Sequence, residues 1–283
     1  MGLLSRIVPR RFRRNRPTIP VVRLDGVIGA GGGFRRGLSM AGVAATLEKA
    51  FKFKDAPAIA LIINSPGGSP VQSRLIFSRI RKLAEKNQIP VLVFVEDVAA
   101  SGGYMLAIAG DEIFVDPTSI VGSIGVISSG FGFTGLIDKI GVERRVYTAG
   151  KNKSTLDPFQ PENKADIAHL KSLQTQVHKV FVDMVKQRRG DRLQDNDDLF
   201  TGMFWSGESA LELGLVDGYG DVYSVIKERF GEKARLTLVT PERNFFGRPK
   251  PGVEGGVSEI SADIANGVIA ALEAKGLWSR YGK

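Results

Sequence analysis

The sequence predicts an α/β fold in which a mostly parallel β-sheet is covered by helices. Short β-branched runs at residues 19–24, 58–63 and 91–95 indicate buried strands. Residues 75–83, between the second and third of these runs, carry apolar side chains at helical spacing. Alternation of strand and helix is the pattern of a parallel sheet with crossover helices, so we expect a single layered domain.

Further elements follow in chain order. Short strands are expected at residues 112–115 and 144–148. A long helix is expected over about residues 162–189, because Pro161 precedes it as a start signal and Gly190 follows it as a stop. These elements belong to a layered domain that we expect to span residues 17–240.

The two ends of the chain differ in composition from this domain. Residues 1–16 form a basic tail, and residues 241–257 are rich in Gly and Pro and are expected to be a linker. Within residues 258–283 an apolar side chain recurs at every fourth position at Ile260, Ile264, Val268 and Leu272. The last pattern predicts an amphipathic carboxy-terminal helix.

Composition narrows the chemistry. The 283-residue chain has no cysteine, which excludes disulfides, cysteine nucleophiles and thiolate zinc sites. Its two histidines, His169 and His178, are nine positions apart on the expected long helix and therefore point to opposite sides. We expect no metal site and no cofactor, and any catalysis has to proceed largely without imidazole.

The formal net charge of +9 is concentrated in the tail. Residues 1–16 hold six arginines and no acidic residue, and without these arginines 33 basic residues face 30 acidic ones. A nearly balanced body predicts no nucleic-acid partner. The tail has the composition to lie on an anionic membrane surface, and a disordered solvated tail is the alternative.

The sequence also carries an expectation about location. Arginines stand where the apolar stretch of a secretory signal would be, and a membrane span needs about 20 predominantly apolar residues. The longest uncharged run, residues 117–137, is rich in Gly, Ser and Thr. We expect a cytoplasmic protein without signal peptide or transmembrane segment, in peripheral contact with the inner face of the membrane.

Three glycine-rich places are candidates for chemistry. Residues 29–33 match neither the dinucleotide nor the phosphate-loop pattern, so a flexible loop is expected there. Residues 64–70, NSPGGSP, separate a strand from a helix, where backbone amides and the helix amino-terminus suit a developing oxyanion; an ordinary tight turn is the alternative.

The third place, AASGGY at residues 99–104, surrounds Ser101 with small residues. These leave the hydroxyl open to a substrate carbonyl, and the amide of Gly102 can point at the same oxygen. The G-x-S-x-G elbow is not present, because Ala99 replaces its first glycine. A helix start that merely contains small residues is the alternative explanation.

Four ordered blocks carry a resemblance to a known family: INSPGGS, VEDVAASGGYMLAIAGDEIF, VGSIGVI and SGESALELGLVDGYGD. From about residue 18 to residue 230 the chain resembles the signal-peptide-peptidase A (protease IV) family of serine peptidases in its short form. The resemblance implies the ClpP and crotonase fold, with one catalytic domain.

The resemblance also implies roles for individual residues. Ser101 corresponds to the nucleophile, and Lys153, 52 positions downstream, corresponds to the general base. Ser123 matches a serine that orients the lysine amine, with a buried turn hydroxyl as the alternative. The amides of Gly68 and Gly102 are the expected oxyanion donors.

Lys151 competes with Lys153 for the role of base. The family pattern G-x-x-K, from Gly150 to Lys153, favours the second lysine. A lysine accepts a proton only when it is neutral, which requires a desolvated pocket.

Short members of the family resemble ClpP in forming closed rings, with eight subunits as the expected number. The lysine of one subunit then meets the serine of its neighbour, and an isolated monomer is inactive. Most members carry an amino-terminal membrane anchor where this chain has its basic tail.

The function expected from these features is that of a serine endopeptidase with a Ser-Lys dyad. It would cleave short or unfolded peptides, such as signal-peptide remnants, through an acyl-enzyme. Two alternatives remain at this point: a crotonase-type acyl-CoA enzyme, which requires an acidic catalytic residue, and a non-catalytic membrane-surface scaffold.

Overall fold

A single sheet organises the chain. The structure, a computed structural model, describes residues 16–29, 37–240 and 275–282. The strands are β1 (Thr18–Asp25), β2 (Ile59–Ser65), β3 (Val91–Ala100), β4 (Glu112–Val115), β5 (Ile120–Gly122), β6 (Phe204–Ser206), β7 (Gly218–Tyr219) and β8 (Arg235–Leu238). They join in the order β6-β5-β3-β2-β1-β8, with β4 between β3 and β7, and all pairings are parallel except β5 with β6. The expected mostly parallel α/β fold is confirmed.

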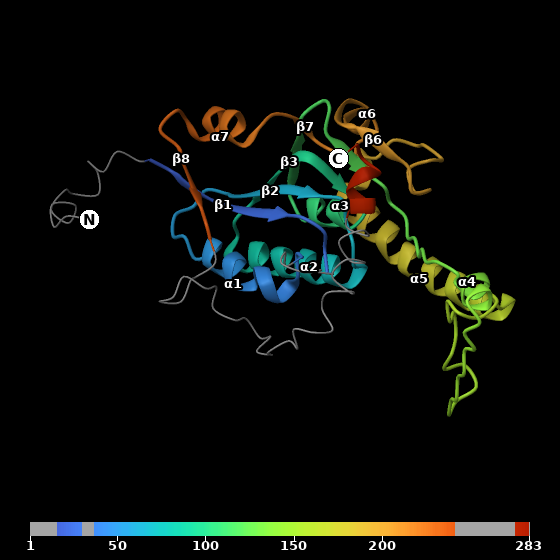
Figure 1. The fold of residues 1–283 in the computed structure, drawn as a ribbon. Helices are drawn as coiled ribbons and strands as arrows, with labels where there is room; N and C mark the ends of the chain where they lie inside the picture. Colours follow the sequence, from blue (N-terminus) through green and yellow to red (C-terminus); the bar gives the residue numbers. More distant parts are fainter. Residues whose placement is uncertain (1–15, 30–36, 241–274, 283) are drawn as a thin grey trace, which may run out of the picture.

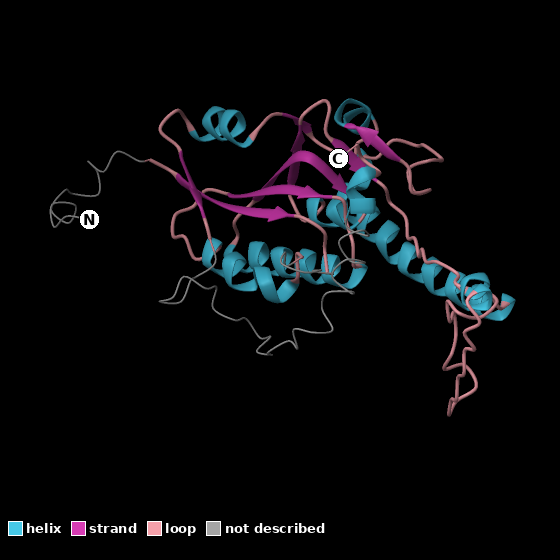
Figure 2. Ribbon diagram, in the orientation of Figure 1, coloured by secondary structure: helices cyan, strands magenta, loops and turns pink. Residues whose placement is uncertain are grey.

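Helices cover both faces of this sheet (Figures 1 and 2). They are α1 (Met40–Ala50), α2 (Pro70–Asn87), α3 (Gly102–Ala107), α4 (Thr134–Lys139), α5 (Lys164–Arg189), a 3₁₀ turn (Gly190–Arg192), α6 (Gly207–Glu212) and α7 (Val222–Phe230). Side chains alternate along each strand, so β2 sends Ile59 and Leu61 to one face and Ala60 to the other. The first face packs on α1, α2, α3 and α5, and the second packs on α7.

Strand β3 changes neighbours halfway along its length. Its first half pairs with β4 and its second half with β5. The register with β2 shifts between the pairs Ile63–Val95 and Ser65–Ala99, so β3 carries two more residues there than β2. An irregularity of this kind bends a strand, and here it lies a few residues before Ser101.

The segment after β5 leaves the body of the molecule. We call residues 126–180 the arm: it contains α4 and the first turns of α5 and extends away from the sheet (Figure 1). None of residues 125–180 is buried. Helix α5 is buried only toward its end, at Phe181, Met184, Val185 and Arg189. The arm therefore has no core of its own within this chain.

One sequence expectation is wrong, and several others fall on residues that the structure does not describe. The strand expected at residues 144–148 is absent, because this exposed stretch of the arm has no neighbouring strand to pair with. The last residues are helical over 275–279, while the expected linker, most of the carboxy-terminal helix, the tail up to residue 15 and most of the loop at 29–33 lie outside the described residues. Among the helices that are described, none has the length and apolarity needed to cross a membrane.

Candidate active site

Ser101 sits in a strained turn between β3 and α3. Its backbone has φ 52° and ψ −121°, a conformation that residues with a side chain rarely adopt and that costs about 1–3 kcal/mol. The surroundings hold it there: the Ser101 amide donates to the carbonyl oxygen of Gly122 at 2.8 Å, and its carbonyl accepts from the amide of Met105 at 3.0 Å. Although Ser101 is the N-cap of α3, its side chain makes no capping hydrogen bond. The hydroxyl is thus left available for other chemistry.

The two glycines after Ser101 are required by close packing. A Cβ on Gly103 would lie 2.3 Å from the carbonyl oxygen of Ser65, and a Cβ on Gly102 would lie 2.4 Å from Oγ of Ser73. Both distances are too short for real atoms, so the start of α3 approaches β2 and α2 only because these positions have no side chain. The SGG sequence therefore has a packing reason as well as a chemical one.

The amides predicted to hold an oxyanion lie next to each other beside Ser101. The amide nitrogen of Gly68 is 3.4 Å from the position that a Cβ on Gly102 would take. A Cβ on Gly67 would lie 2.9 Å from the amide nitrogen of Gly102 and 2.8 Å from Cβ of Ser101. Gly102 is the first residue of α3, so its amide has no acceptor within the helix. The structure brings Gly68, Gly102 and Ser101 close together.

Ser123 is also close to Ser101. In the β3–β5 pairing Ala100 lies opposite Gly122, so the two serines follow at the same edge of neighbouring parallel strands. Ser123 also has a positive φ, 51°, and its amide donates to the carbonyl oxygen of Met203 at 2.7 Å. The strand pairing therefore places a second serine at the same edge of the sheet as the first, although Ser123 does not line the hollow at Ser101.

A small hollow opens at these residues and has a volume of about 10 Å³. Its lining consists of Gly68, Pro70, Ser101, Gly102, Met105, Gly125, Val126, Val177 and Phe181. All of these are uncharged, and the only side-chain hydroxyl is that of Ser101. The lining of the hollow therefore contains no carboxyl group that could act as an acid or a base.

The hollow also shows what sequence reasoning missed. Met105 stands one turn after Ser101 on α3, and Phe181 reaches the site from α5, eighty positions further along the chain. Helical periodicity marks Phe181 as buried. No local pattern shows that it is buried against Ser101.

Lys153 lies elsewhere. It is exposed on the arm, its amide donates to the carbonyl oxygen of Gly150 at 3.2 Å, and its side chain folds back over that glycine. No described residue forms an ion pair with its amine, and neither Lys153 nor Lys151 lines the hollow. Within one chain the structure does not bring the predicted base to the predicted nucleophile.

The histidines and acidic residues form no metal site in the described part of the chain. His178 is partly buried, with Nε2 3.0 Å from the carbonyl oxygen of Ile124, whereas His169 is exposed. His178 therefore links α5 to the segment that follows β5, as a structural residue does.

A parallel α/β sheet that presents a serine in a strained turn beside two backbone amides has the construction of a serine hydrolase. The family model that matches this chain is Peptidase family S49, over residues 83–235, which is more than half of the sequence. The chain belongs to peptidase family S49, as the sequence blocks predicted. The matched region contains Ser101, Ser123 and Lys153.

Relatives of known name match the sequence of this chain over different lengths. A Na(+)/H(+) antiporter NhaA of Brucella melitensis is 57% identical over 287 residues, covering 99% of this chain and 39% of that protein. A putative signal peptide peptidase SppA of Enterococcus faecium is 32% identical over 174 residues, covering 62% of this chain and 50% of that protein. The chain thus spans between about two fifths and half of the length of these relatives.

A solved structure supports the fold. A serine-to-alanine mutant of the 1510-N membrane-bound stomatin-specific protease superposes with a TM-score of 0.50 at 15% sequence identity, covering 80% of this chain and 99% of that one. At this identity the likeness concerns the fold alone.

Proposed function

We propose that this chain is a serine peptidase whose nucleophile is Ser101. The proposal rests on the hydroxyl of Ser101, which makes no capping hydrogen bond to α3. It lies in a strained turn beside the amides of Gly68 and Gly102. Membership of a peptidase family supports it. The antiporter name belongs to a relative of which this chain matches 39%, so that name describes a much longer protein.

The mechanism follows from this geometry. A neutral lysine amine removes the proton of Ser101 as Oγ bonds to the peptide carbonyl carbon. The amides of Gly68 and Gly102 donate to the resulting oxyanion, and each such donor contributes about 2.7–4 kcal/mol. The intermediate collapses to an acyl-enzyme as the lysine returns the proton to the leaving amine, and water then hydrolyses the ester.

Lys153 is the base in this proposal, and it comes from a second copy of the chain. The arm that carries Lys153 has no buried residue, yet it exposes many large apolar side chains. These are Ile127, Phe131, Leu136, Ile140, Val142, Tyr147, Leu156, Leu173, Val177 and Val180. Exposed apolar surface on this scale marks a protein interface. Packing on a neighbour buries the arm and desolvates the lysine, and in this proposal Ser123 then orients its amine.

Head-to-tail packing of this kind closes into a ring when each copy gives its arm to the next. A ring in which every site takes Ser101 from one copy and Lys153 from another is therefore the assembly we propose. Its substrates are short or unfolded peptides, because a bond enclosed by such a ring is accessible only to an extended chain.

The uncharged hollow separates this function from the acyl-CoA alternative. Enolate chemistry requires an acidic residue at the reacting carbon, and none lines the hollow. The scaffold alternative depends on the basic tail, which lies outside the described residues. Cytoplasmic location and peripheral membrane contact through that tail remain proposals, to be tested by liposome flotation with and without residues 1–16.

The function is tested by labelling with a fluorophosphonate probe and by peptide hydrolysis on the same samples. We expect wild type to label and to hydrolyse, and Ser101→Ala and Lys153→Ala to lose both. Lys151→Ala is the matched control, since that lysine is equally exposed two positions away, and it is expected to stay active. If the correctly assembled wild type neither reacts with the probe nor hydrolyses peptides, the proposed peptidase function is wrong.

A further inference from the structure

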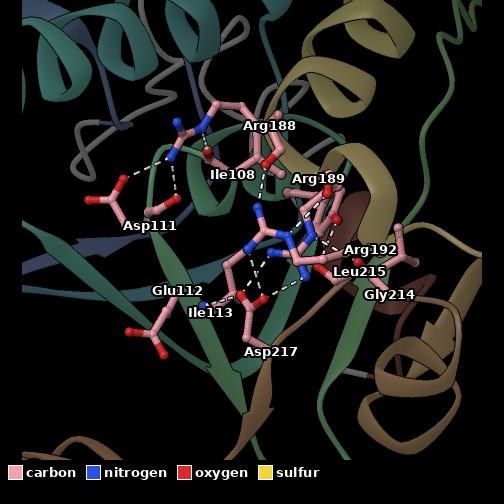
Figure 3. A network of polar contacts seen from close by, with 12 residues as sticks. Ile108, Asp111, Glu112, Ile113, Arg188, Arg189, Arg192, Gly214, Leu215 and Asp217 are labelled. Atoms are coloured by element: carbon pink, nitrogen blue, oxygen red, sulfur yellow. Dashed lines mark hydrogen bonds and ion pairs between the residues drawn. The ribbon is translucent and has the colours of Figure 1, made fainter.

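Asp111 lies just beyond the end of α3 that is remote from Ser101, where it joins two other helices. One carboxylate oxygen, Oδ1, accepts from Arg81 of α2 at 2.8 Å. The same oxygen accepts from Arg188 of α5 at 3.1 Å (Figure 3). The other, Oδ2, accepts from the amide of Val91 at the start of β3 at 2.9 Å. One side chain thus holds three elements. We call Arg81, Asp111 and Arg188 the rear anchor.

The two arginines also bind the backbone that follows α3. Arg188 donates from Nε to the carbonyl oxygen of Ile108 at 2.8 Å and from Nη2 to that of Gly110 at 2.6 Å. Arg81 donates to the carbonyl oxygen of Ala109 at 3.0 Å. Carbonyls at a helix carboxy-terminus lack intrahelical donors and carry partial negative charge, so cations are favoured there. The rear anchor thereby fixes the end of α3 between α2 and α5.

Each anchored helix also carries part of the active site. Helix α3 begins at Gly102, next to Ser101, and α2 begins at Pro70, two positions after Gly68. Phe181 lines the hollow from α5 about two turns before Arg188. The nucleophile, both oxyanion amides and the apolar wall therefore depend on helices that meet at the rear anchor.

The negative charge of Asp111 offsets the repulsion between the two neighbouring arginines. The side chains of Arg81 and Arg188 are 16% and 23% exposed, so both guanidinium groups are largely withdrawn from water. Burial and the nearby charge of Arg81 lower the pKa of Arg188, and the hydrogen bond that Arg188 donates to Asp111 opposes this. Without the carboxylate, two partly desolvated cations face each other, and α2 and α5 are pushed apart.

We infer that Asp111 is a positioning residue for the reaction at Ser101, acting by holding α2, α3 and α5 in register behind the site. This inference rests on the proposed peptidase function. It assigns Asp111 no contact with substrate. Its effect falls on the alignment of the amides of Gly68 and Gly102 with the attacking hydroxyl, which matters most in the transition state.

Glu112, the next residue, provides a matched control. It forms a two-point ion pair with Arg229 of α7, at 2.5 Å for both oxygens, on the opposite face of the sheet. Asp111 and Glu112 are thus neighbouring acids, each paired with arginine. Only the first is connected to helices that line the hollow.

The test compares Asp111→Asn with Glu112→Gln in the assembled protein. The readouts are kcat and KM for a fluorogenic peptide, the rate of fluorophosphonate labelling, and the sedimentation coefficient. Asp111→Asn is expected to lower kcat and the labelling rate about 10- to 100-fold with KM nearly unchanged, since the loss concerns the transition state. Glu112→Gln is expected to leave all three readouts unchanged.

Arg188→Lys gives a second variant that keeps the positive charge and loses the forked contact, so an intermediate fall in kcat is expected. Equal values of kcat for Asp111→Asn, Arg188→Lys and wild type would overturn the inference, and so would a change confined to KM. Those results require a reactive wild type. An unreactive, assembled wild type would overturn the proposed function itself, so the two failures are distinguishable.

Discussion

The backbone amide of Ser101 donates a 2.8 Å hydrogen bond to the carbonyl oxygen of Gly122, the last residue of β5. The nucleophile's position is therefore set by a strand of only three residues. That strand is held in turn by β6, where Trp205 covers Gly122. A disturbance at Gly122 moves Ser101 and Ser123 together.

Gly122→Ala is expected to reduce activity strongly. Gly122 has φ +103°, and a Cβ there would lie 2.7 Å from Cε3 of Trp205, so β5 has to shift. Overpacking of this kind costs about 1–3 kcal/mol, and displacement of the nucleophile lowers kcat about 100-fold. Urea unfolding and peptide hydrolysis measure the two effects. Gly276→Ala, at a position outside the arm with nothing within 4 Å of the added Cβ, is the control and should change neither.

Asp217→Asn is expected to destabilise the fold in a pH-dependent way. Arg189, with a side chain 2% exposed, pairs with Asp217 at 2.7 Å, and Arg192 pairs with the same carboxylate at 3.0 Å (Figure 3). Burial alone would raise the pKa of Asp217, but the hydrogen bonds and charge of Arg189 outweigh it and hold the pKa below 3.8. Removing the carboxylate leaves a buried cation, which costs about 3–5 kcal/mol.

The sign of this pH dependence is fixed by the lowered pKa. The stabilisation by Asp217 is fully present above the unfolded value of 3.8 and is lost as the pH falls through the lower folded value. Urea midpoints of wild type and Asp217→Asn should therefore differ most near neutral pH and converge in acid. Glu232→Gln, which removes an exposed pair with Lys227, should show no difference at any pH. A gap for Asp217→Asn that is constant with pH would contradict this assignment.

Phe131→Asp is expected to weaken assembly without weakening the fold of the chain. Phe131 is 81% exposed on the arm, so the change removes no contact within the body. On the proposed interface it places a charge against apolar surface. Sedimentation velocity should show smaller species and hydrolysis should fall in parallel. Tyr223→Asp, at an exposed position on α7, tests the specificity of the effect, and equal dissociation of both variants would argue against the arm as the interface.

Sequence patterns predicted the sheet and much of the site because both depend on local signals. Buried strands such as β2 show as β-branched runs, and β4 begins and ends where expected. Gly68 and Gly102 stand out in short glycine runs, and in the structure a Cβ at either position would clash with a neighbouring residue. The block containing Ser101 is distinctive in itself. Each of these features can be predicted from a short run of consecutive residues.

The remaining features depend on contacts between distant parts of the chain. Strands β5 and β6 have three residues each, too short for periodicity to show. The strand wrongly expected at residues 144–148 has β-branched and aromatic residues but no partner strand. Asp111 and Arg188 form a hydrogen bond although they are 77 positions apart in the sequence, and neither local sequence predicts this contact.

A complementation experiment tests the central claim most directly. Ser101→Ala and Lys153→Ala chains, each with a different affinity tag, are produced together and purified through both tags. If each site takes Ser101 from one copy and Lys153 from the next, about a quarter of the sites in mixed rings recover both residues, so hydrolysis returns to about a quarter of wild type. Mixed assemblies that remain as inactive as either variant alone, or chains that never co-purify, would contradict a site shared between copies.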